Sequence, residues 1–425
     1  MFPNPQDVLP LSPHPNLEQY EKEAKDLVSA CLSGAPDALR EWAARWPEHA
    51  PQLEAFARDT LTSRHCALTS AQYVIARMHG FDSWPKFSAH LDGLGRAGSP
   101  IANFEAAAEA VVTGDGAGLE RLIRRQPSLA RARSARVHRA TLLHYAAANG
   151  VENYRQTTPP NAVAIVELLL AAGAEVDAEA DMYGGGCTTL GLVATSIHPE
   201  RAGVQHALLQ TLIDRGAALD HPRGAGNNHL YVGGCLANGR SAAAEFLAAR
   251  GAPLDLEGAA GIGRLDVVQS YFDPDGRLKP TATVEELHAA FGSACAYGRI
   301  AVVEFLLDRG VPVDATLRRD GQMGLHAAAL GGHAAIVALL LDHRAPVNAV
   351  EDRFKGTPLT WGLHGWSDPP YGTPSDRYYD VISRLVRAGA VVNPRWIDDT
   401  AADTPFRRRL QADPRMRAAL TEGRS

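Results

Sequence analysis

Apolar and small residues recur along this chain at helical spacing, in short segments that end at a glycine. Residues 335–341 read Ala-Ile-Val-Ala-Leu-Leu-Leu, and the preceding segment holds three consecutive alanines at 327–329. This spacing predicts two amphipathic helices, and the small side chains let them pack closely as an antiparallel pair. Gly332 separates the segments, as expected for a helix end in a left-handed conformation. One such pair cannot bury its apolar face alone, so the pattern predicts neighbouring pairs that stack.

The same pattern returns several times along the chain. The segment Val-Glu-Leu-Leu-Leu-Ala-Ala-Gly-Ala at 166–174 has related copies at 212–217, 246–252, 305–310, 339–345 and 385–390. The landmark residue near the end of each copy is Gly173, Gly216, Gly251, Gly310, Arg344 or Gly389, with spacings of 43, 35, 59, 34 and 45. These spacings fit a unit of about 33 residues with insertions, and the longest accommodates one additional shortened unit.

A second landmark precedes these segments. Short helical stretches end in Gly-Arg or Gly-His at Gly239-Arg240, Gly263-Arg264, Gly298-Arg299 and Gly332-His333. The tetrads Thr141-Leu-Leu-His144 and Thr357-Pro-Leu-Thr360 open two units, and Gly324-Leu-His326 is a partial copy. With these features, residues 104–393 resemble the ankyrin-repeat family, in its bacterial type with many repeats and insertions. The resemblance implies an all-α solenoid of about eight helix-turn-helix units with short hairpin fingers, in which His144 and His326 bond neighbouring turns.

The remaining segments are expected to flank this array. We expect a flexible N-terminus at 1–15, a helical cap of degenerate repeats at 16–92 and a linker at 93–103. Residues 394–425 are rich in arginine and are expected to form a C-terminal cap and tail.

The composition restricts the function classes. Basic side chains number 42 and acidic ones 48 among 425 residues, and the net charge of −6 argues against a general nucleic-acid binder. No apolar run is long enough for a membrane span, and Met1 to Pro15 shows no signal peptide. The cysteines are odd in number and form no Cys-x-x-Cys pair, which predicts a reduced compartment without disulfides or structural zinc; they are Cys31, Cys66, Cys187, Cys235 and Cys295. We therefore expect a cytoplasmic protein with no nucleic-acid, membrane, metal or cofactor partner.

The resemblance also places a set of side chains on a concave groove, lined by the fingers and by the ends of the first helices. These side chains are polar or aromatic, so we expect the groove to recognise a protein or peptide partner through aromatic anchors and polar contacts. The candidate ligand-binding residues are His138, Arg139, Tyr183, Gly184, Gly185, Gly186, Cys187, Thr195, Asn228, Tyr297, Gln322, Phe354, His364 and Trp366.

Insertions support an alternative function for the same groove. They lie at 151–161, 197–206 and 365–379, at turns where they would enclose it. The unit that begins near Asp255 has no room for a finger, which leaves Glu257 beside a gap. The alternative is an enzyme or small-molecule binder with a Glu/His acid–base pair. Its candidate catalytic residues are Glu257, His229, His288 and Tyr231.

Each chemical motif also has a structural interpretation. The amides of Gly184 to Gly186 suit an anion, but a hairpin turn equally needs residues that tolerate positive φ. Cys187 is a potential nucleophile, although the sequence indicates no adjacent base. The run of seven arginines between residues 121 and 139 suits either an acidic partner or a solvated helix face.

Overall fold

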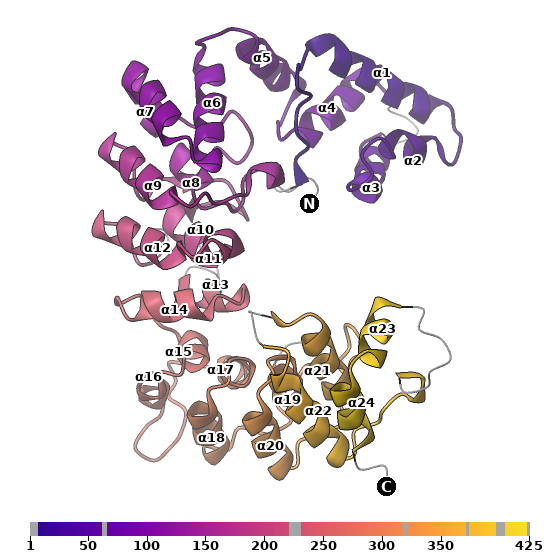
Figure 1. Ribbon diagram of the computed structural model, residues 1–425, viewed down its shortest axis with the longest axis vertical. Coiled ribbons are helices and arrows are strands. Elements are labelled where there is room, and N and C mark those ends of the chain that lie inside the picture. The colour runs from indigo at the N-terminus through magenta and orange to yellow at the C-terminus, as the bar shows by residue number, and fades with distance from the viewer. Residues whose placement is uncertain are drawn as a thin grey trace. The chain divides into compact units, whose positions relative to one another are not determined.

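The computed structural model describes residues 7–61, 66–220, 231–317, 321–370, 374–396 and 404–422. The chain divides into two compact units, Met1–His229 and Leu230–Ser425, whose elements are labelled in Figure 1. Both units are built mainly from helices, in agreement with the expected all-α repeat solenoid. Within the described ranges, no helix combines the length and the apolar character that crossing a membrane requires.

The first unit begins with a helical module at residues 7–94, which we call the N-terminal module. The side chains of Tyr20, Phe81 and Phe87 are buried in its core together with Leu27 and Val74. The rings of Tyr20 and Phe87 meet edge to face with centroids 5.0 Å apart, a favoured aromatic geometry. Its helices are α1 (Leu17–Leu32), α2 (Ala38–Ala43), α3 (Ala50–Thr60), α4 (Leu68–Met78) and α5 (Trp84–Leu94).

The segment before α1 packs against this module, so the prediction of a flexible N-terminus is wrong for its described part. Leu9 is 4% exposed, and its amide donates to the Met78 carbonyl oxygen at 2.8 Å. His79 Nδ1 lies 3.1 Å from the Leu9 carbonyl oxygen. Val8 and Leu9 are both buried, and burial of two aliphatic side chains offsets the entropy lost by ordering a short segment.

The N-terminal module contains a disulfide bond, which corrects the expectation that the cysteines are unpaired. Cys31 and Cys66 are bonded, and their Cα atoms lie 6.0 Å apart. They are separated by 35 positions, but α1 packs against α4 and brings its last turn beside the start of α4. Sequence spacing does not reveal such proximity. Cys187, Cys235 and Cys295 are free thiols.

Three helix pairs follow in the first unit. The expected linker is a tight turn, because Ser99 caps α6 through the Ala102 amide at 3.0 Å and donates to the Gly93 carbonyl at 2.6 Å. The pairs are α6 (Pro100–Thr113) with α7 (Gly116–Arg125), α8 (Leu142–Tyr145) with α9 (Ala162–Ala171), and α10 (Thr189–Thr195) with α12 (Gln205–Asp214). Shorter elements between them are η2 (Pro127–Arg131), η3 (Asn153–Arg155), α11 (Ile197–Arg201), β1 (Glu179–Ala180) and β2 (Cys187–Thr188).

In the described part of the second unit, five helix pairs are followed by a helical C-terminus. The pairs are α13 (Tyr231–Ala237) with α14 (Ser241–Ala248), α15 (Leu256–Ile262) with α16 (Leu265–Ser270), α17 (Val284–Ala296) with α18 (Ile300–Asp308), α19 (Gly324–Leu330) with α20 (Ala334–Asp342), and α21 (Pro358–Ser367) with α22 (Arg377–Arg387). The chain ends with η5 (Pro394–Trp396), α23 (Pro405–Gln411) and α24 (Pro414–Thr421). Leu410 and Leu420 are fully buried in the core of this unit, so the terminal helices cover its last pair.

The repeated landmarks act as the sequence predicted. Gly332 has φ +73° at the end of α19, where a left-handed residue closes the helix. His326 Nδ1 accepts the Met323 amide at 3.2 Å, and its other nitrogen lies 3.1 Å from the Ala349 carbonyl. His144 pairs in the same way with Thr141 and the Cys187 carbonyl. The prediction that these histidines bond neighbouring turns is confirmed.

Candidate functional site

A glycine-rich finger in the first unit carries several candidate residues. Strands β1 and β2 pair antiparallel, with Glu179 opposite Thr188 and Ala180 opposite Cys187. At the tip, Tyr183 and the three following glycines all have positive φ, between +50° and +105°. The Gly185 amide donates to the Met182 carbonyl at 2.8 Å. The glycines are therefore required by the turn itself.

The finger is tied to the adjacent helix pair by a chain of polar side chains. The Tyr183 hydroxyl donates to Asn149 Oδ1 at 2.7 Å, and Asn149 Nδ2 donates to Thr195 Oγ1 at 3.0 Å. Thr195 in turn donates to the Gly191 carbonyl at 2.9 Å. Tyr183 remains 56% exposed, so one edge of the ring is fixed while the rest faces solvent. The structure thus brings together Tyr183 and Thr195, which the sequence proposed, through Asn149, which it did not.

Cys187 does not have the properties of a nucleophile. Its thiol donates to the Met182 carbonyl oxygen at 3.0 Å. Burial raises the pKa of this thiol to about 11, which keeps it protonated near neutral pH. The thiolate is the reactive species, so this cysteine contributes to the finger's shape and lacks nucleophilic chemistry.

A second finger, at 350–356 in the second unit, is closed by a buried carboxylate. Glu351 is 1% exposed and accepts the amides of Arg353 at 2.8 Å, Phe354 at 3.0 Å and Gly356 at 2.8 Å. Burial raises the pKa of the Glu351 carboxyl, but these amide bonds outweigh it and hold the pKa below its usual value. An ionised carboxylate that accepts three backbone amides fixes the turn firmly.

This finger presents an exposed aromatic side chain. Phe354 is 66% exposed, and its ring centroid lies 6.1 Å from that of Trp361 on α21. The Arg353 guanidinium lies 4.9 Å from the Phe354 centroid. His364 is exposed one turn after Trp361, so both lie on one side of α21. Phe354, Trp361 and His364, with Arg353, form what we call the Phe354 surface.

The insertion at 151–161 folds inward, although we expected it to enclose the groove. Glu152 is fully buried, and Arg155 of η3 is 8% exposed. Arg155 Nη1 lies 2.7 Å from Glu105 Oε2, and Arg136 Nη1 lies 2.7 Å from Glu105 Oε1. Arg136 Nε makes an ionic contact of 2.9 Å with Glu152 Oε1. We call Glu105, Arg136, Glu152 and Arg155 the ionic cluster.

The ionic cluster adjoins two buried histidines. His138, proposed for the groove, is fully buried, and its Nε2 lies 3.5 Å from Glu152 Oε1. His138 therefore does not face the groove as expected, because its ring turns inward and accepts the Ala140 amide at 3.0 Å. His90 Nε2 lies 3.9 Å from Glu105 Oε1, and burial lowers the pKa of His90 to about 4. Burial raises the pKa of the Glu105 and Glu152 carboxyls, but Arg136, Arg155 and the adjoining histidines together outweigh it and hold both pKa values below the usual range.

The other insertions also serve packing. Gln205 is buried, and its amide nitrogen donates to the carbonyls of Val193, Ala194 and Ser196, so the 197–206 insertion is fastened to the end of α10. In the 365–379 insertion, residues 371–373 lie outside the described part. Trp366 is 1% exposed, which corrects its expected place in the groove, because α23 covers it. The Phe406 ring lies 6.3 Å from the Trp366 ring, and the Arg409 guanidinium 4.7 Å from it.

The proposed catalytic residues that the structure describes lie on the first helices of three successive pairs, α13, α15 and α17. Glu257 is exposed in the first turn of α15, and His288 is half-buried in α17. Tyr231 is 8% exposed as the first residue of α13, so burial corrects its expected access to the groove. His229 and the ligand-binding candidate Asn228 lie outside the described residues. Within those residues, no three His, Cys, Asp or Glu side chains gather as metal ligands.

Three further candidate residues are described: Arg139, Tyr297 and Gln322. Arg139 is exposed in the loop between Arg133 and Thr141, with φ +51°. Its carbonyl accepts Arg133 Nη1 at 3.0 Å. Tyr297 is half-buried, and its hydroxyl donates to the Leu236 carbonyl. Gln322 is half-buried before α19, where its carbonyl accepts the Leu317 amide at 2.7 Å.

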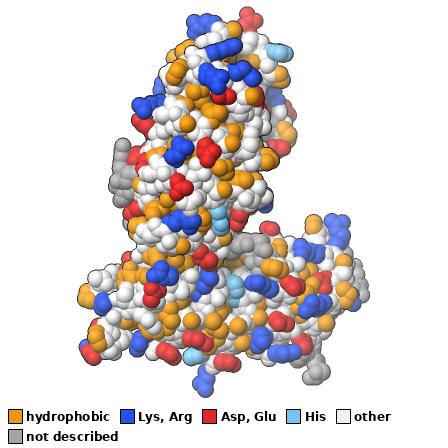
Figure 2. All heavy atoms as spheres, turned by 60° about the vertical axis from the view of Figure 1, so that its left-hand side comes forward, with side chains coloured by type: hydrophobic (Ala, Val, Ile, Leu, Met, Phe, Trp, Pro, Cys, Tyr) orange, Lys and Arg blue, Asp and Glu red, His pale blue; other side chains and the backbone are white. Residues whose placement is uncertain are grey.

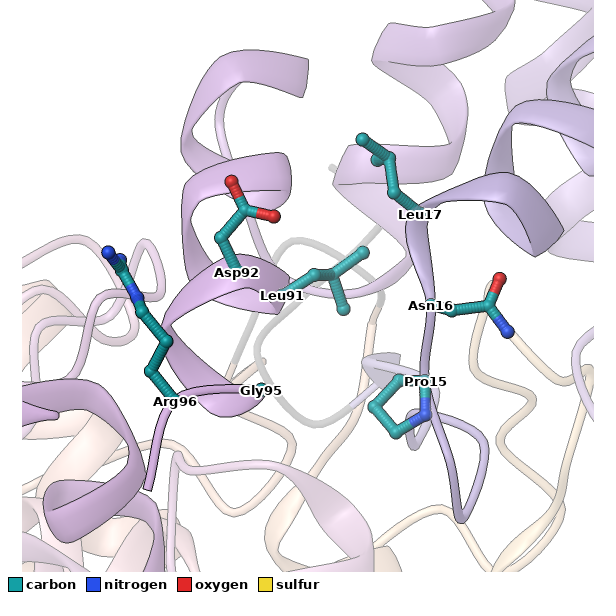
Figure 3. A pocket seen from close by; sticks show the side chains of 7 residues that line it. All are labelled: Pro15, Asn16, Leu17, Leu91, Asp92, Gly95 and Arg96. Carbon is teal, nitrogen blue, oxygen red and sulfur yellow. The ribbon is translucent and has the colours of Figure 1, made fainter. Parts of the chain in front are cut away.

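A cavity of ≈ 440 Å³ lies at the N-terminal module, and no candidate residue is part of its lining (Figure 3). Its lining comes from the segment before α1 and from the end of α5: Pro15, Asn16, Leu17, Leu91, Asp92, Gly95 and Arg96. The Asn16 side chain caps α1 by accepting the Gln19 amide at 2.9 Å, and Asp92 and Arg96 are exposed. Asn16 thus serves as a helix cap, and Asp92 and Arg96 are solvated surface residues.

Several residues that shape these surfaces were not proposed from the sequence. Asn149 had a signal, since it precedes Gly150, whose φ is +73°. Trp361 follows the Thr-Pro-Leu-Thr tetrad directly, and Glu351 lies five residues before Gly356 in an expected finger. Glu105 is a charged residue with Phe104 before it and an Ala-Ala-Ala run after it. A charge in such a stretch indicates a buried partner.

One protein-family model matches part of the second unit. The family described as ankyrin repeats (many copies) matches residues 292–341, from the last part of α17 into α20. Among solved structures, the chain is similar to the human ASB11 ankyrin repeat domain, at 20% identity and a TM-score of 0.33, over 66% of this chain and 96% of that one. No curated protein matches the chain. This protein therefore contains ankyrin repeats, identified directly at residues 292–341.

Proposed function

We propose that this chain is a binding protein that recognises a protein or peptide partner, with the Phe354 surface as its main anchor. The observation that carries the proposal is an aromatic ring, 66% exposed, on a finger that a buried carboxylate holds in place. Aromatic side chains dominate the energetics of protein interfaces, and an ordered anchor loses little conformational entropy on binding. Ankyrin repeats are a known protein-interaction module, which agrees with this assignment.

The protein surface carries mixed chemistry that favours recognition through individual anchors. On the face shown in Figure 2, hydrophobic side chains are interspersed with both signs of charge. A mixed surface of this kind suits a partner that inserts a few side chains around an aromatic residue. The Tyr183 finger of the first unit supplies a second exposed aromatic ring, fixed through Asn149.

The test begins with photo-crosslinking in extracts of the native cell. A photoreactive phenylalanine analogue at Phe354 is compared with the same analogue at Val391, which is 72% exposed elsewhere in the unit. A partner that crosslinks at Phe354 alone is then purified, and its affinity is measured by calorimetry. Phe354→Ala is expected to weaken binding about thirtyfold or more, as truncation of an interface hot spot does.

The control is Val391→Ala, which is expected to leave the affinity unchanged. Unaltered affinity in Phe354→Ala, for every partner that crosslinks anywhere on the chain, removes the Phe354 surface from the proposed function. Circular dichroism of the variant verifies that the exposed substitution leaves the fold intact.

A further inference from the structure

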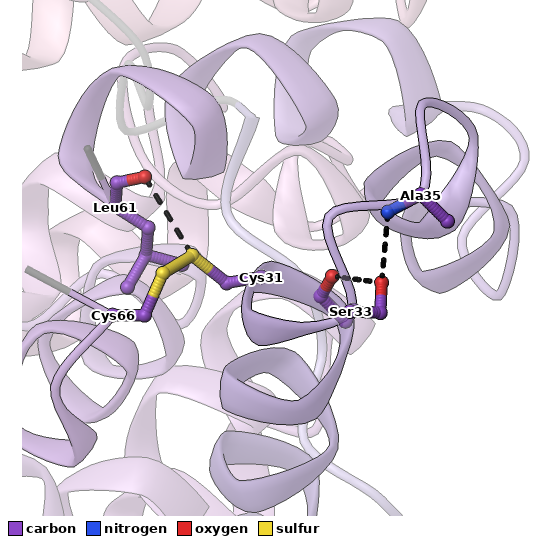
Figure 4. The surroundings of a disulfide bond; sticks show 6 residues. Cys31, Ser33, Ala35, Leu61 and Cys66 are labelled. Atoms are coloured by element: carbon purple, nitrogen blue, oxygen red, sulfur yellow. Dashed lines mark hydrogen bonds between the residues drawn. A yellow bond between two sulfur atoms is a disulfide. The ribbon is translucent and has the colours of Figure 1, made fainter. Parts of the chain in front are cut away.

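The disulfide between Cys31 and Cys66 lies at the edge of the N-terminal module. Cys31 lies in the last turn of α1 and Cys66 just before α4, as Figure 4 shows. Both residues are half-buried, so the sulfurs are not sealed inside the core. The bond closes a loop that contains α2 and α3, which together we call the α2–α3 hairpin.

The other cysteines are kept out of thiol chemistry. Cys235 and Cys295 are fully buried, and burial raises the pKa of both thiols, that of Cys235 to about 12. Cys187 is half-buried, with a thiol pKa raised by burial to about 11. Thiol–disulfide exchange needs a thiolate and access, so these thiols are poor exchange partners. Among the cysteines, Cys31 and Cys66 are therefore the pair suited to thiol–disulfide exchange.

The core of the N-terminal module has a part that does not depend on this bond. Tyr20, Val74 and Phe87 belong to α1, α4 and α5 and are buried together. The α2–α3 hairpin contributes Trp42 and Leu53 to the same apolar cluster, with Ala43, Ala57 and Leu61 beside them. Loss of the disulfide therefore leaves the packing of α1, α4 and α5 in place and removes the covalent restraint on the hairpin.

We propose that Cys31 and Cys66 form a reversible thiol–disulfide switch that determines how firmly the α2–α3 hairpin is held against α1 and α4. This proposal is independent of the partner-binding function assigned to the Phe354 surface. The reductant is a low-molecular-weight thiol of the glutathione class, and the oxidant is its disulfide.

The exchange occurs in two steps. The thiolate of the reductant attacks one cysteine sulfur, the protein S–S bond breaks, and a mixed disulfide forms while the other cysteine leaves as a thiolate. A second thiolate attacks the reductant's sulfur in that mixed disulfide and releases the small-molecule disulfide. In total, two reductant thiols supply two electrons, and Cys31 and Cys66 gain the two protons.

Opening of the hairpin changes the apolar surface of the module. Leu32, next to Cys31, is 69% exposed, and Leu68, close to Cys66, is 42% exposed. Trp42, at 3% exposure, and Leu53, fully buried, lie under the closed hairpin. When the restraint is lost, the hairpin opens more often and these side chains join the apolar residues that already flank the disulfide.

The experiment uses the full-length protein in glutathione buffers from fully oxidised to fully reduced. The fraction of free Cys31 and Cys66 is read by alkylation and peptide mass spectrometry, and hydrogen–deuterium exchange is measured in the same buffers. Reduction is expected to free both cysteines in the folded protein and to raise amide exchange in residues 38–60 about a hundredfold. Exchange in α4 and α5 is expected to stay unchanged.

Three results would overturn the proposal. The pair could stay oxidised until the protein is unfolded, exchange could rise equally in α1, α4 and α5, or reduction could leave residues 38–60 unaltered. The Cys31→Ser/Cys66→Ser variant is expected to match the reduced protein in every buffer. Cys187→Ser is the matched control and is expected to keep the full redox response. Direct reduction of the wild type tests the proposal even if the double variant does not fold.

Discussion

The two units bury different chemistry in their cores. Around the joint between the N-terminal module and the first helix pairs, Glu105, Arg136, Glu152 and Arg155 are packed together with at most 9% exposure each. The later pairs of the second unit bury a continuous apolar cluster that includes Phe291 and Leu340. Glu351, a buried carboxylate of that unit, bonds backbone amides of its own finger.

The comparison shows what the insertion at 151–161 contributes. Regular repeats stack through similar apolar faces. The N-terminal module meets the repeats through charged side chains as well. Arg136 reaches both Glu105 and Glu152, and its guanidinium lies 5.6 Å from the Phe81 ring of the N-terminal module. The Val137 amide donates to the Gly80 carbonyl at 2.9 Å. The insertion therefore fixes one specific docking of the module on the repeats, at the desolvation cost that buried charges carry.

Acidification is expected to give the largest difference in unfolding free energy between the two units. His79, His90 and His144 of the first unit are buried, and burial lowers the pKa of each to about 4. The unfolded chain titrates near pH 6.5, so stability is full above that pH and is lost as the pH falls toward 4. Between pH 6.5 and 5, each histidine is expected to cost on the order of 2 kcal/mol. In the second unit, burial lowers the pKa of the half-buried His333.

Fluorine NMR of protein labelled with 5-fluorotryptophan reads the units independently. Trp84 reports the first unit and Trp366 the second, and urea titrations at pH 7 and pH 5 give both unfolding free energies. His90→Gln is expected to reduce the pH dependence seen at Trp84, because it removes one of the three histidines whose pKa burial lowers to about 4. His364→Gln, at an exposed position, is the control and is expected to change nothing. An equal loss of unfolding free energy at Trp84 and Trp366 between pH 7 and pH 5 would contradict the expected difference between the units.

Removal of one charge from the ionic cluster is the next largest effect. Arg136→Met keeps an apolar stem but leaves Glu105 and Glu152 buried without their shared partner. The first unit is expected to lose about 3 to 5 kcal/mol of unfolding free energy, because uncompensated buried charges are strongly destabilising. Arg125→Met, at the exposed end of α7, is the matched control. A loss below about 1 kcal/mol at Trp84 would show that the cluster is dispensable.

The repeats were predictable from sequence because their signals are local. Gly332 and His326 act within one helix pair and its neighbour, so periodicity and tetrad spacing suffice to assign them. The ionic cluster joins residues 31 and 50 positions apart, and no local pattern shows which way an insertion folds. Trp366 was assigned to the groove by its place in the unit, but the terminal helices that cover it are outside the repeat pattern. Tertiary contacts of this kind decide where insertions and caps lie.

A deletion in the apolar core is expected to be somewhat milder and confined to the second unit. Leu340 is fully buried in the cluster around α20, and Leu340→Ala removes its contacts and leaves a cavity. The expected loss is about 3 kcal/mol at Trp366, with none at Trp84. Val350→Ala, at a 55% exposed position, is the control and is expected to cost less than about 0.5 kcal/mol. A loss shared by both reporters would mean that the units unfold together.

Substitutions at helix N-caps are expected to cause the smallest losses of unfolding free energy. The two units also offer equivalent caps for this test. Asp115 begins α7 and accepts the Gly118 amide at 2.8 Å, and Asp255 begins α15 and accepts the Gly258 amide at 2.7 Å. Asp115→Ala and Asp255→Ala are each expected to cost about 1 kcal/mol, and the Asn variants of both are expected to retain most of the stability, because the amide oxygen still accepts.

These two caps hold the local chemistry constant while the surrounding cores differ. Equal losses at Trp84 and Trp366 would show that the units share the energetics of their repeats and differ at the ionic joint alone. A loss at Asp115 well above that at Asp255 would contradict this conclusion, because α7 packs against α6, the helix that carries Glu105. The cap would then act through the ionic cluster, and the joint between module and repeats would extend one helix further than the contacts of Arg136 indicate.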